Sequence, residues 1–178
     1  MHRKFSAALA ALAVSSFAFV ASAQGAKPTD PQIAHIAYTA GNIDIEAAKM
    51  ALKMSKNADV RAFAENMVKD HETVNKLALD LCKKLGVTPE DNDTSKALAK
   101  GAAAKRAELA KLSGTAFDKA YMENEVAYHK TVNGALETAL IPSSSNAELK
   151  GLLQQGLKIF KGHQQHAEHT ASMIKETK

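Results

Sequence analysis

The chain has 178 residues, of which 46% are hydrophobic and 24% charged, and this length fits one domain with its own hydrophobic core. Its single cysteine excludes a disulfide within the chain. The formal net charge of +4 is not gathered into lysine and arginine clusters with interleaved aromatic residues, so we expect no nucleic acid partner.

The first 23 residues have the pattern of an export signal. A positively charged start, His2-Arg3-Lys4, precedes an apolar run over residues 5–20, and Ala21-Ser22-Ala23 provides the small residues that signal peptidase accepts. We predict a signal peptide over residues 1–23 and a periplasmic protein, with secretion as the alternative. A bilayer-spanning helix needs roughly 20 apolar residues, and no segment of the mature form reaches this length, so we expect no transmembrane anchor.

The sequence after the signal peptide is typical of helices separated by short turns. It has few β-branched or aromatic residues and no alternating strand pattern. The first helix should begin at Asp30-Pro31, with Asp30 as its N-cap, and run to Lys56-Asn57. The second should begin near Asp59 and end at Gly86.

Two further long helices are each predicted from a capping box, in which Ser or Thr pairs with an acidic residue three positions later. The pairs are Thr115 with Asp118 and Ser145 with Glu148. Pro142 should end the first of these two helices.

A shorter helix rich in alanine and lysine, from about Ser95 to Leu112, is expected to connect the two pairs of long helices. Four long helices joined by brief turns predict an all-α fold, an antiparallel four-helix bundle with this additional short connecting helix. The predicted organisation after the signal peptide is a short linker over residues 24–30 and one helical bundle domain over residues 31–176.

Each long helix carries an ionisable residue where leucine would be expected. His71, His129 and His163 lie on the apolar stripes of three helices, and Glu46 lies at the edge of the stripe of the first. A buried carboxylate or imidazole without a partner costs on the order of several kcal/mol. We therefore expect these groups to be hydrogen-bonded, ion-paired or bound to a metal ion.

A metal site is the most specific of these three possibilities. Glu125 and His129 are spaced i to i+4, which places both side chains on one helix face. Asp70 flanks its stripe, where it can join the site or orient an imidazole through its second nitrogen. Counted from the turns, His163 lies several residues deeper than the others and needs a shifted last helix to join them. The candidate metal ligands are Glu46, Asp70, His71, Glu125, His129 and His163.

The donor types limit which metal the site can hold. The chain contains no Glu-x-x-His motif, which disfavours redox di-iron catalysis. A mixed carboxylate and imidazole site suits zinc, iron, manganese or copper, and the sequence does not choose among them. For each histidine taken singly, a hydrogen bond to a carbonyl or carboxylate in the core is the alternative.

The segment KGHQQHAEHT places His163, His166 and His169 three residues apart. We expect His163 to face inward, and His166 and His169 to form a solvated face that titrates near neutral pH. The alternative is a second, weaker site of the copper or zinc type, made by His166 and His169 together with His35.

Four segments, GNIDIEAAKMA, VRAFAENMVKDHETVNKLALDL, LSGTAFDKAYMENEVAYHKTV and LKGLLQQGLKIFKGHQQH, together resemble the exported bacterial ferritin-like domains of unknown function, which are often labelled outer membrane proteins. The resemblance covers roughly residues 31–172. Its most specific points are Asp70-His71 after Met67, Phe117-Asp118-x-x-Tyr121 before His129, and the late His163.

This resemblance implies a ferritin-like four-helix bundle in the cell envelope, with no assigned activity. Carried over by position, it nominates Glu46, Asp70, His71, His129 and His163. The chain departs from the family at Tyr128, where an acidic residue is common, and at Glu125, where the family has an apolar residue.

Two classes of function remain. The first is binding of a transition-metal ion inside the bundle, for metal handling or envelope stress protection. The second is a non-catalytic interaction module of the envelope, whose buried polar network fixes helix register and whose partner is a second copy or another envelope protein. The sequence favours a protein that is not an enzyme, because it has no serine triad, glycine-rich phosphate loop or zinc-protease motif.

Overall fold

The computed structural model describes residues 27–174, which form helices joined by short loops and contain no strand. The predicted signal peptide and the last residues of the predicted domain lie outside this range. The all-α prediction is confirmed. The long helices are α1 (Asp30–Met54), α2 (Ala58–Leu85), α4 (Gly114–Ala135) and α6 (Ala147–Met173), and the shorter ones are α3 (Asp93–Leu109), the π-helix η1 (Leu136–Leu140) and α5 (Ile141–Ser143).

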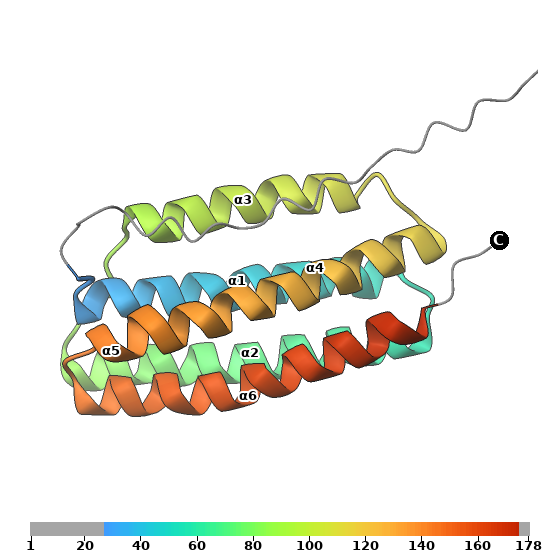
Figure 1. Cartoon of the computed structure of the whole chain (residues 1–178). Helices are drawn as coiled ribbons and strands as arrows, with labels where there is room; N and C mark the ends of the chain where they lie inside the picture. Colours follow the sequence, from blue (N-terminus) through green and yellow to red (C-terminus); the bar gives the residue numbers. More distant parts are fainter. Residues whose placement is uncertain (1–26, 175–178) are drawn as a thin grey trace, which may run out of the picture.

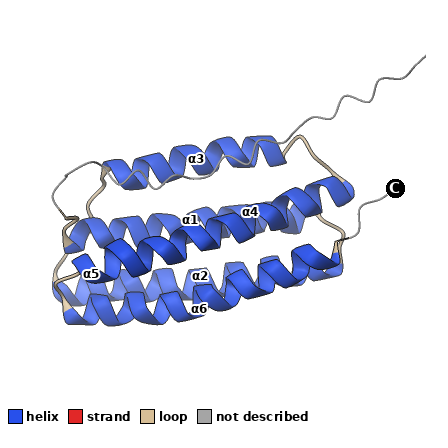
Figure 2. Cartoon of the chain, in the orientation of Figure 1, coloured by secondary structure: helices blue, strands red, loops and turns tan. Residues whose placement is uncertain are grey.

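The helices lie side by side in tiers (Figure 1; Figure 2). α1 packs mainly against α2, and α4 packs mainly against α6. α2 and α6 are also in contact, whereas α3 lies on the outside against α1. Within the described part of the chain, no helix has both the length and the apolar character needed to cross a bilayer.

The caps of α1 and α6 differ from those predicted. Thr29 is the N-cap of α1, because its hydroxyl accepts the N–H of Gln32 and the Gln32 side chain accepts the N–H of Thr29. Asp30 instead accepts the Ser145 hydroxyl at 2.6 Å and the N–H of Asn146 at 2.9 Å. With Ser145 engaged in this way, Asn146 caps α6. These contacts join the beginnings of α1 and α6.

The start of α4 also differs from the prediction. The helix begins at Gly114, whose φ of +56° lies in the left-handed region that favours glycine, and Ser113 is its N-cap. Thr115 and Asp118 therefore lie inside the helix and do not define its start. The connecting helix α3 begins at Asp93, close to its predicted position.

The end of α4 is widened into the π-helix η1. The N–H of Ile141 bonds the carbonyl of Leu136, five residues earlier. Pro142 follows, and a proline has no N–H to donate and crowds the carbonyl four residues before it. A wider turn relieves this crowding, so the helix continues through α5 to Ser143 and does not stop at Pro142.

Two apolar clusters form the core, one towards each end of the molecule. The first includes Phe63, Met67, Phe117 and Met122, and the second includes Ile33, Leu136, Leu153 and Phe160, all of which are buried. All four long helices contribute buried residues to the first cluster. α1, α4 and α6 contribute buried residues to the second cluster, and α2 packs against it. Between the clusters, the same helices carry buried polar residues, so the core is divided by a polar layer.

α1 packs tightly against α2 at Gly41. A Cβ atom there would lie 2.2 Å from Asn75 Oδ1, while the Asn75 amide donates to Asn42 Oδ1 at 2.9 Å. Gly41→Ala should therefore lower the free energy of unfolding by about 1–3 kcal/mol through overpacking. Urea denaturation measures this loss. The matched control is Gly162→Ala in α6, where no neighbouring atom is near, and it should gain up to about 1 kcal/mol from helix propensity. Equal stability gains in both variants would contradict the close packing.

Candidate metal centre

The polar layer draws one or two side chains from each long helix: Asp44 from α1, His71 from α2, Glu125 and His129 from α4, and His163 from α6. Asp44, His71, His129 and His163 lie about four helical turns from the end of the molecule at which α1 and α6 begin, and Glu125 lies about one turn further from it on α4. All five residues are at most 6% exposed. The fold therefore places five ionisable side chains within about one helical turn of the same depth inside the protein.

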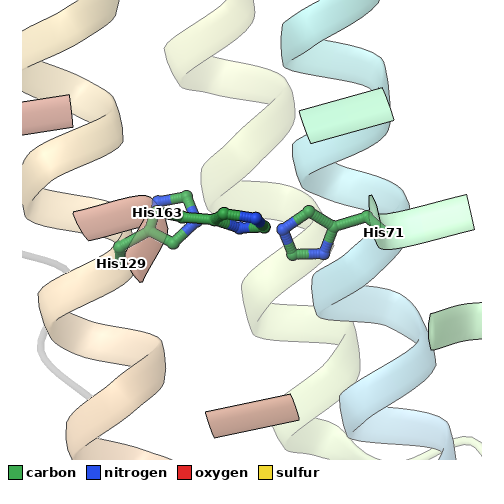
Figure 3. A group of neighbouring side chains, drawn as sticks. All are labelled: His71, His129 and His163. Atoms are coloured by element: carbon green, nitrogen blue, oxygen red, sulfur yellow. The ribbon is translucent and has the colours of Figure 1, made fainter. Parts of the chain in front are cut away.

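The three histidines of this layer project towards one another from three different helices (Figure 3). The ring centroids are 5.2 Å apart for His71 and His163, 5.5 Å for His129 and His163, and 6.0 Å for His71 and His129. One nitrogen of each ring lies within 4.8 Å of the other two. Nitrogen ligands bind zinc at about 2.0–2.1 Å, which places them roughly 3.4 Å apart around a tetrahedral ion. Small side-chain rotations would bring the three rings to that spacing.

Asp44 places a negative charge beside two of these rings. Its Oδ2 atom lies 3.0 Å from His71 Nε2 and 3.2 Å from His129 Nε2, and its side chain is fully buried. Burial by itself raises the pKa of Asp44, but the attraction and the hydrogen bond of His71 contribute most to outweighing it and hold the pKa below its usual value. The carboxyl group is therefore ionised at neutral pH.

His129 is oriented by its own helix. Its Nδ1 lies 3.0 Å from the carbonyl oxygen of Glu125, and a carbonyl can only accept, so Nδ1 carries the proton. Burial is the main reason that the pKa of His129 is lowered, which keeps the ring neutral. The lone pair of Nε2 then faces the Asp44 carboxylate without a hydrogen-bond donor between them. Two acceptors in this position attract a cation.

His163 is held by a carboxylate outside the layer. Its Nε2 donates to Asp70 Oδ2 at 3.0 Å, and its buried Nδ1 has no hydrogen-bond partner. Burial is the main cause that lowers the pKa of His163 to about 4. A carboxylate that fixes one ring nitrogen and leaves the other free is the usual arrangement of metal-binding histidines. Asp70, which the sequence placed either in the site or beside an imidazole, bonds His163.

Glu125 is the neutral acid of the layer. Burial, followed by the negative charge of Asp44, raises the pKa of Glu125 well above its usual value. A cavity of about 20 Å³ borders Asp44 and Glu125, and this is room for about one water molecule. With His129, these two acids make a second group of closely spaced donor atoms. The polar layer thus offers nitrogen atoms that can bind a metal ion on one side, and carboxyl oxygen atoms that can do so on the other.

Glu46, a candidate metal ligand predicted at the edge of its stripe, does not join the polar layer. Its side chain is 58% exposed and binds Arg106 Nη2 at 2.7 Å. Asp44 takes the interior position, because two residues correspond to about 200° of rotation around a helix. The sequence did carry a signal for Asp44, which lies four residues after Ala40 and three before Ala47 on the apolar stripe.

The expected excess depth of His163 is also wrong. The residues between Ser143 and Ala147 form a loop and a helix cap, and they add no helical rise. Counted from Ala147, His163 reaches the same depth as the other members of the polar layer. Neither a shifted last helix nor a longer one is needed.

The structure does not bring together the second candidate site. His35 Nδ1 lies 4.0 Å from Asp91 Oδ1, near the end at which α1 begins. His166 packs against Phe63 at a centroid distance of 5.2 Å, towards the opposite end, and His169 is exposed. The site with His35 was predicted on the assumption that α6 finishes where α1 begins. Instead the two helices begin at the same end, so this expectation is wrong.

A family model matches almost the whole length of these helices. The family described as Domain of unknown function (DUF4142) matches residues 15–170. The chain belongs to this family. The predicted membership of a family without assigned function is thereby confirmed, whereas its ferritin-like character stays a prediction.

One solved structure similar to this DUF4142 protein is described as "CopM in the Cu(II)-bound form". The two share 16% sequence identity with a TM-score of 0.61, and the match covers 82% of this chain and 98% of that chain. Similarity at this level of identity shows the fold alone. No curated protein matches the sequence.

Proposed function

We propose that this protein binds one transition-metal ion in its polar layer and handles that ion without catalysing a reaction. His71, His129 and His163 would be the ligands, and the buried carboxylate of Asp44 would supply the negative charge. One observation carries the proposal: three buried imidazoles from three helices lie with a nitrogen of each within 4.8 Å of the others.

The protonation of the rings supports binding of a cation. His129 and His163 each use one nitrogen to donate to a protein oxygen, so their other nitrogens present lone pairs. These two nitrogens are buried without hydrogen-bond partners, and the Asp44 carboxylate lies against the rings of His71 and His129. Buried polar atoms left without partners are costly, and an ion at their centre would satisfy them together.

Copper is the first ion to test. Imidazole ligands suit copper, zinc and iron, and among the divalent ions of the series copper binds a given nitrogen site most tightly. A solved structure of similar fold is described in a Cu(II)-bound form, which supports testing Cu(II) first. Zinc is the necessary comparison, because imidazole ligands suit it as well.

We further propose the architecture and the cellular location of the protein. α1, α2, α4 and α6 would form a ferritin-like four-helix bundle, with α3 as an addition on its outside. The signal over residues 1–23 would direct the protein to the periplasm. There the bound ion would be held away from water by the apolar clusters on both sides of the layer.

Metal titration of the tag-free chain from Gln24 onwards, first stripped with a chelator, tests the site. We expect one Cu(II) ion per chain in isothermal titration calorimetry with a competing chelator. His71→Ala and His129→Ala should each weaken binding by roughly 100-fold or more, since loss of an outer-shell group alone costs about 10–100-fold. His169→Ala removes an exposed histidine of α6 and should leave the affinity unchanged.

The opposite result would favour the interaction module. Contacts of Asp44 with His71 and His129, and of Asp70 with His163, already link the four long helices without an ion. If neither Cu(II) nor Zn(II) binds the wild type, or if His169→Ala weakens binding as much as His129→Ala, the layer is a structural network and the metal proposal fails.

A further inference from the structure

A second internal space lies next to the polar layer. It is a cavity of about 50 Å³ in the half of the molecule where α1 and α6 begin, and residues of α1, α2, α3, α4, η1 and α6 line it. Several of its lining positions carry small residues, among them Ala40, Ala78, Ala135 and Gly156. Leu136 and Leu140 of the widened turn η1 form another part of its wall. The cavity therefore arises where side chains are small and the helix is wide.

The lining does not suit water. Asn75 is its one polar residue, and the Asn75 amide nitrogen already donates to Asn42 Oδ1 and to the carbonyl of Tyr38. A buried water molecule typically needs about two to four polar partners, and apolar cavities stay dry and bind apolar guests such as xenon. The volume is about one third of the roughly 150 Å³ of a cavity that takes benzene, so the guest must be smaller.

The cavity adjoins the imidazole cluster through one aromatic ring. Phe160 lines the cavity and also stacks on His71, with ring centroids 4.6 Å apart and planes 11° from parallel. A guest in the cavity would thus lie one ring away from the proposed metal site.

We propose that this cavity binds a small, uncharged, apolar molecule of the size of dioxygen. The site is distinct from the metal site and needs no ion to form, so it goes beyond the proposed function. Its ligand is recognised by size and by the absence of charge, because nothing in the lining offers a free hydrogen-bond donor.

Xenon is the first probe. Methyl NMR spectra of the metal-free mature chain under xenon pressure should show saturable shifts at Leu140 and Leu153, which line the cavity, and little change at the exposed Leu77. Ala135→Val adds two carbon atoms at the wall and should reduce the shifts at least tenfold. Gly162→Ala has no neighbouring atom near the added methyl group and should respond as the wild type does.

Dioxygen itself is the second probe, because it is paramagnetic. In oxygen-saturated buffer, the relaxation of the Leu140 and Leu153 methyl groups should increase several-fold more than that of Leu77. Gly156→Ala adds a methyl group 3.4 Å from the Phe160 ring and serves if Ala135→Val does not fold. No xenon-dependent shift in the wild type, or equal shifts in the wall variants and Gly162→Ala, would overturn the proposal. Both measurements use metal-free protein, so they succeed or fail independently of the metal titration.

Discussion

Asp44→Asn is expected to lower the free energy of unfolding of the metal-free protein by about 2 kcal/mol, because it weakens the contact of the Asp44 carboxylate with His71, and a hydrogen bond to a charged group contributes roughly 1.5–3 kcal/mol. The Asp44 carboxylate lies 3.0 Å from His71 Nε2 and 3.2 Å from His129 Nε2 and has no access to solvent. Asparagine keeps the shape and removes the negative charge that faces His71 Nε2. Urea denaturation at pH 7.5, followed by circular dichroism, measures the change.

The control for this substitution lies two residues away on the same helix. Glu46→Gln removes a carboxylate that is more than half exposed and paired with Arg106 at the surface. Exposed ion pairs contribute about 0–1 kcal/mol, so this variant should remain close to the wild type. Equal losses for Asp44→Asn and Glu46→Gln would show that the interior placement of Asp44 is wrong.

Acid should destabilise the metal-free protein well above the pH at which most carboxylates titrate. The pKa of His163 is about 4 in the folded protein, against an ordinary value of 6.5. Between these two values the unfolded chain binds a proton at His163 and the folded chain does not, so unfolding becomes more favourable as the pH falls. The contribution of neutral His163 is complete above about pH 6.5 and is lost by about pH 4. At about 1.4 kcal/mol per unit, this amounts to about 3 kcal/mol.

His129 and Asp44 of the polar layer also change the free energy of unfolding with pH, each in a direction that follows from its pKa shift. The pKa of His129 is also lowered, mainly by burial, and it adds to the loss in the same direction. The pKa of Asp44 is lowered as well, so its stabilising effect is lost only at lower pH, as the carboxylate becomes protonated. The window from about pH 6.5 to pH 4 therefore reports mainly on the histidines.

The measurement is the melting temperature of chelator-treated protein at several values of pH through this window. His163→Gln should flatten the dependence, because glutamine takes up no proton in either state. His169→Gln removes an exposed histidine of the same helix and should leave the slope unchanged. If His163→Gln keeps the slope of the wild type, His163 is not the group responsible.

The sequence alone predicted the helices and three of the polar positions. Apolar residues repeat at helical spacing around His71, His129 and His163, and an ionisable residue on such a stripe points into the core wherever the stripe packs. The same argument applied to Glu125, one turn before His129. These inferences succeeded because periodicity is a local property of the chain.

The sequence did not identify the correct residue among close neighbours where the apolar pattern or the cap pattern was weak. Glu46 was chosen at the edge of a stripe, although Asp44 occupies the buried face of α1. Asp30 and Ser145 were assigned to separate helix caps, but they bind each other across 115 positions of the chain. A local pattern gives no information on a partner that lies so far away in sequence.

What the sequence by itself determined is which faces of the four long helices are buried, because the period of the helix and the position of apolar residues decide this before the helices meet. The tertiary structure decided the depth at which those faces meet. Loop lengths, the wide turn η1 and the Asp30 contacts set the axial position of each helix. Only that alignment brings Asp44 and three imidazoles into one layer, because a side chain reaches a few ångströms and an axial shift of one turn, about 5.4 Å, would separate them.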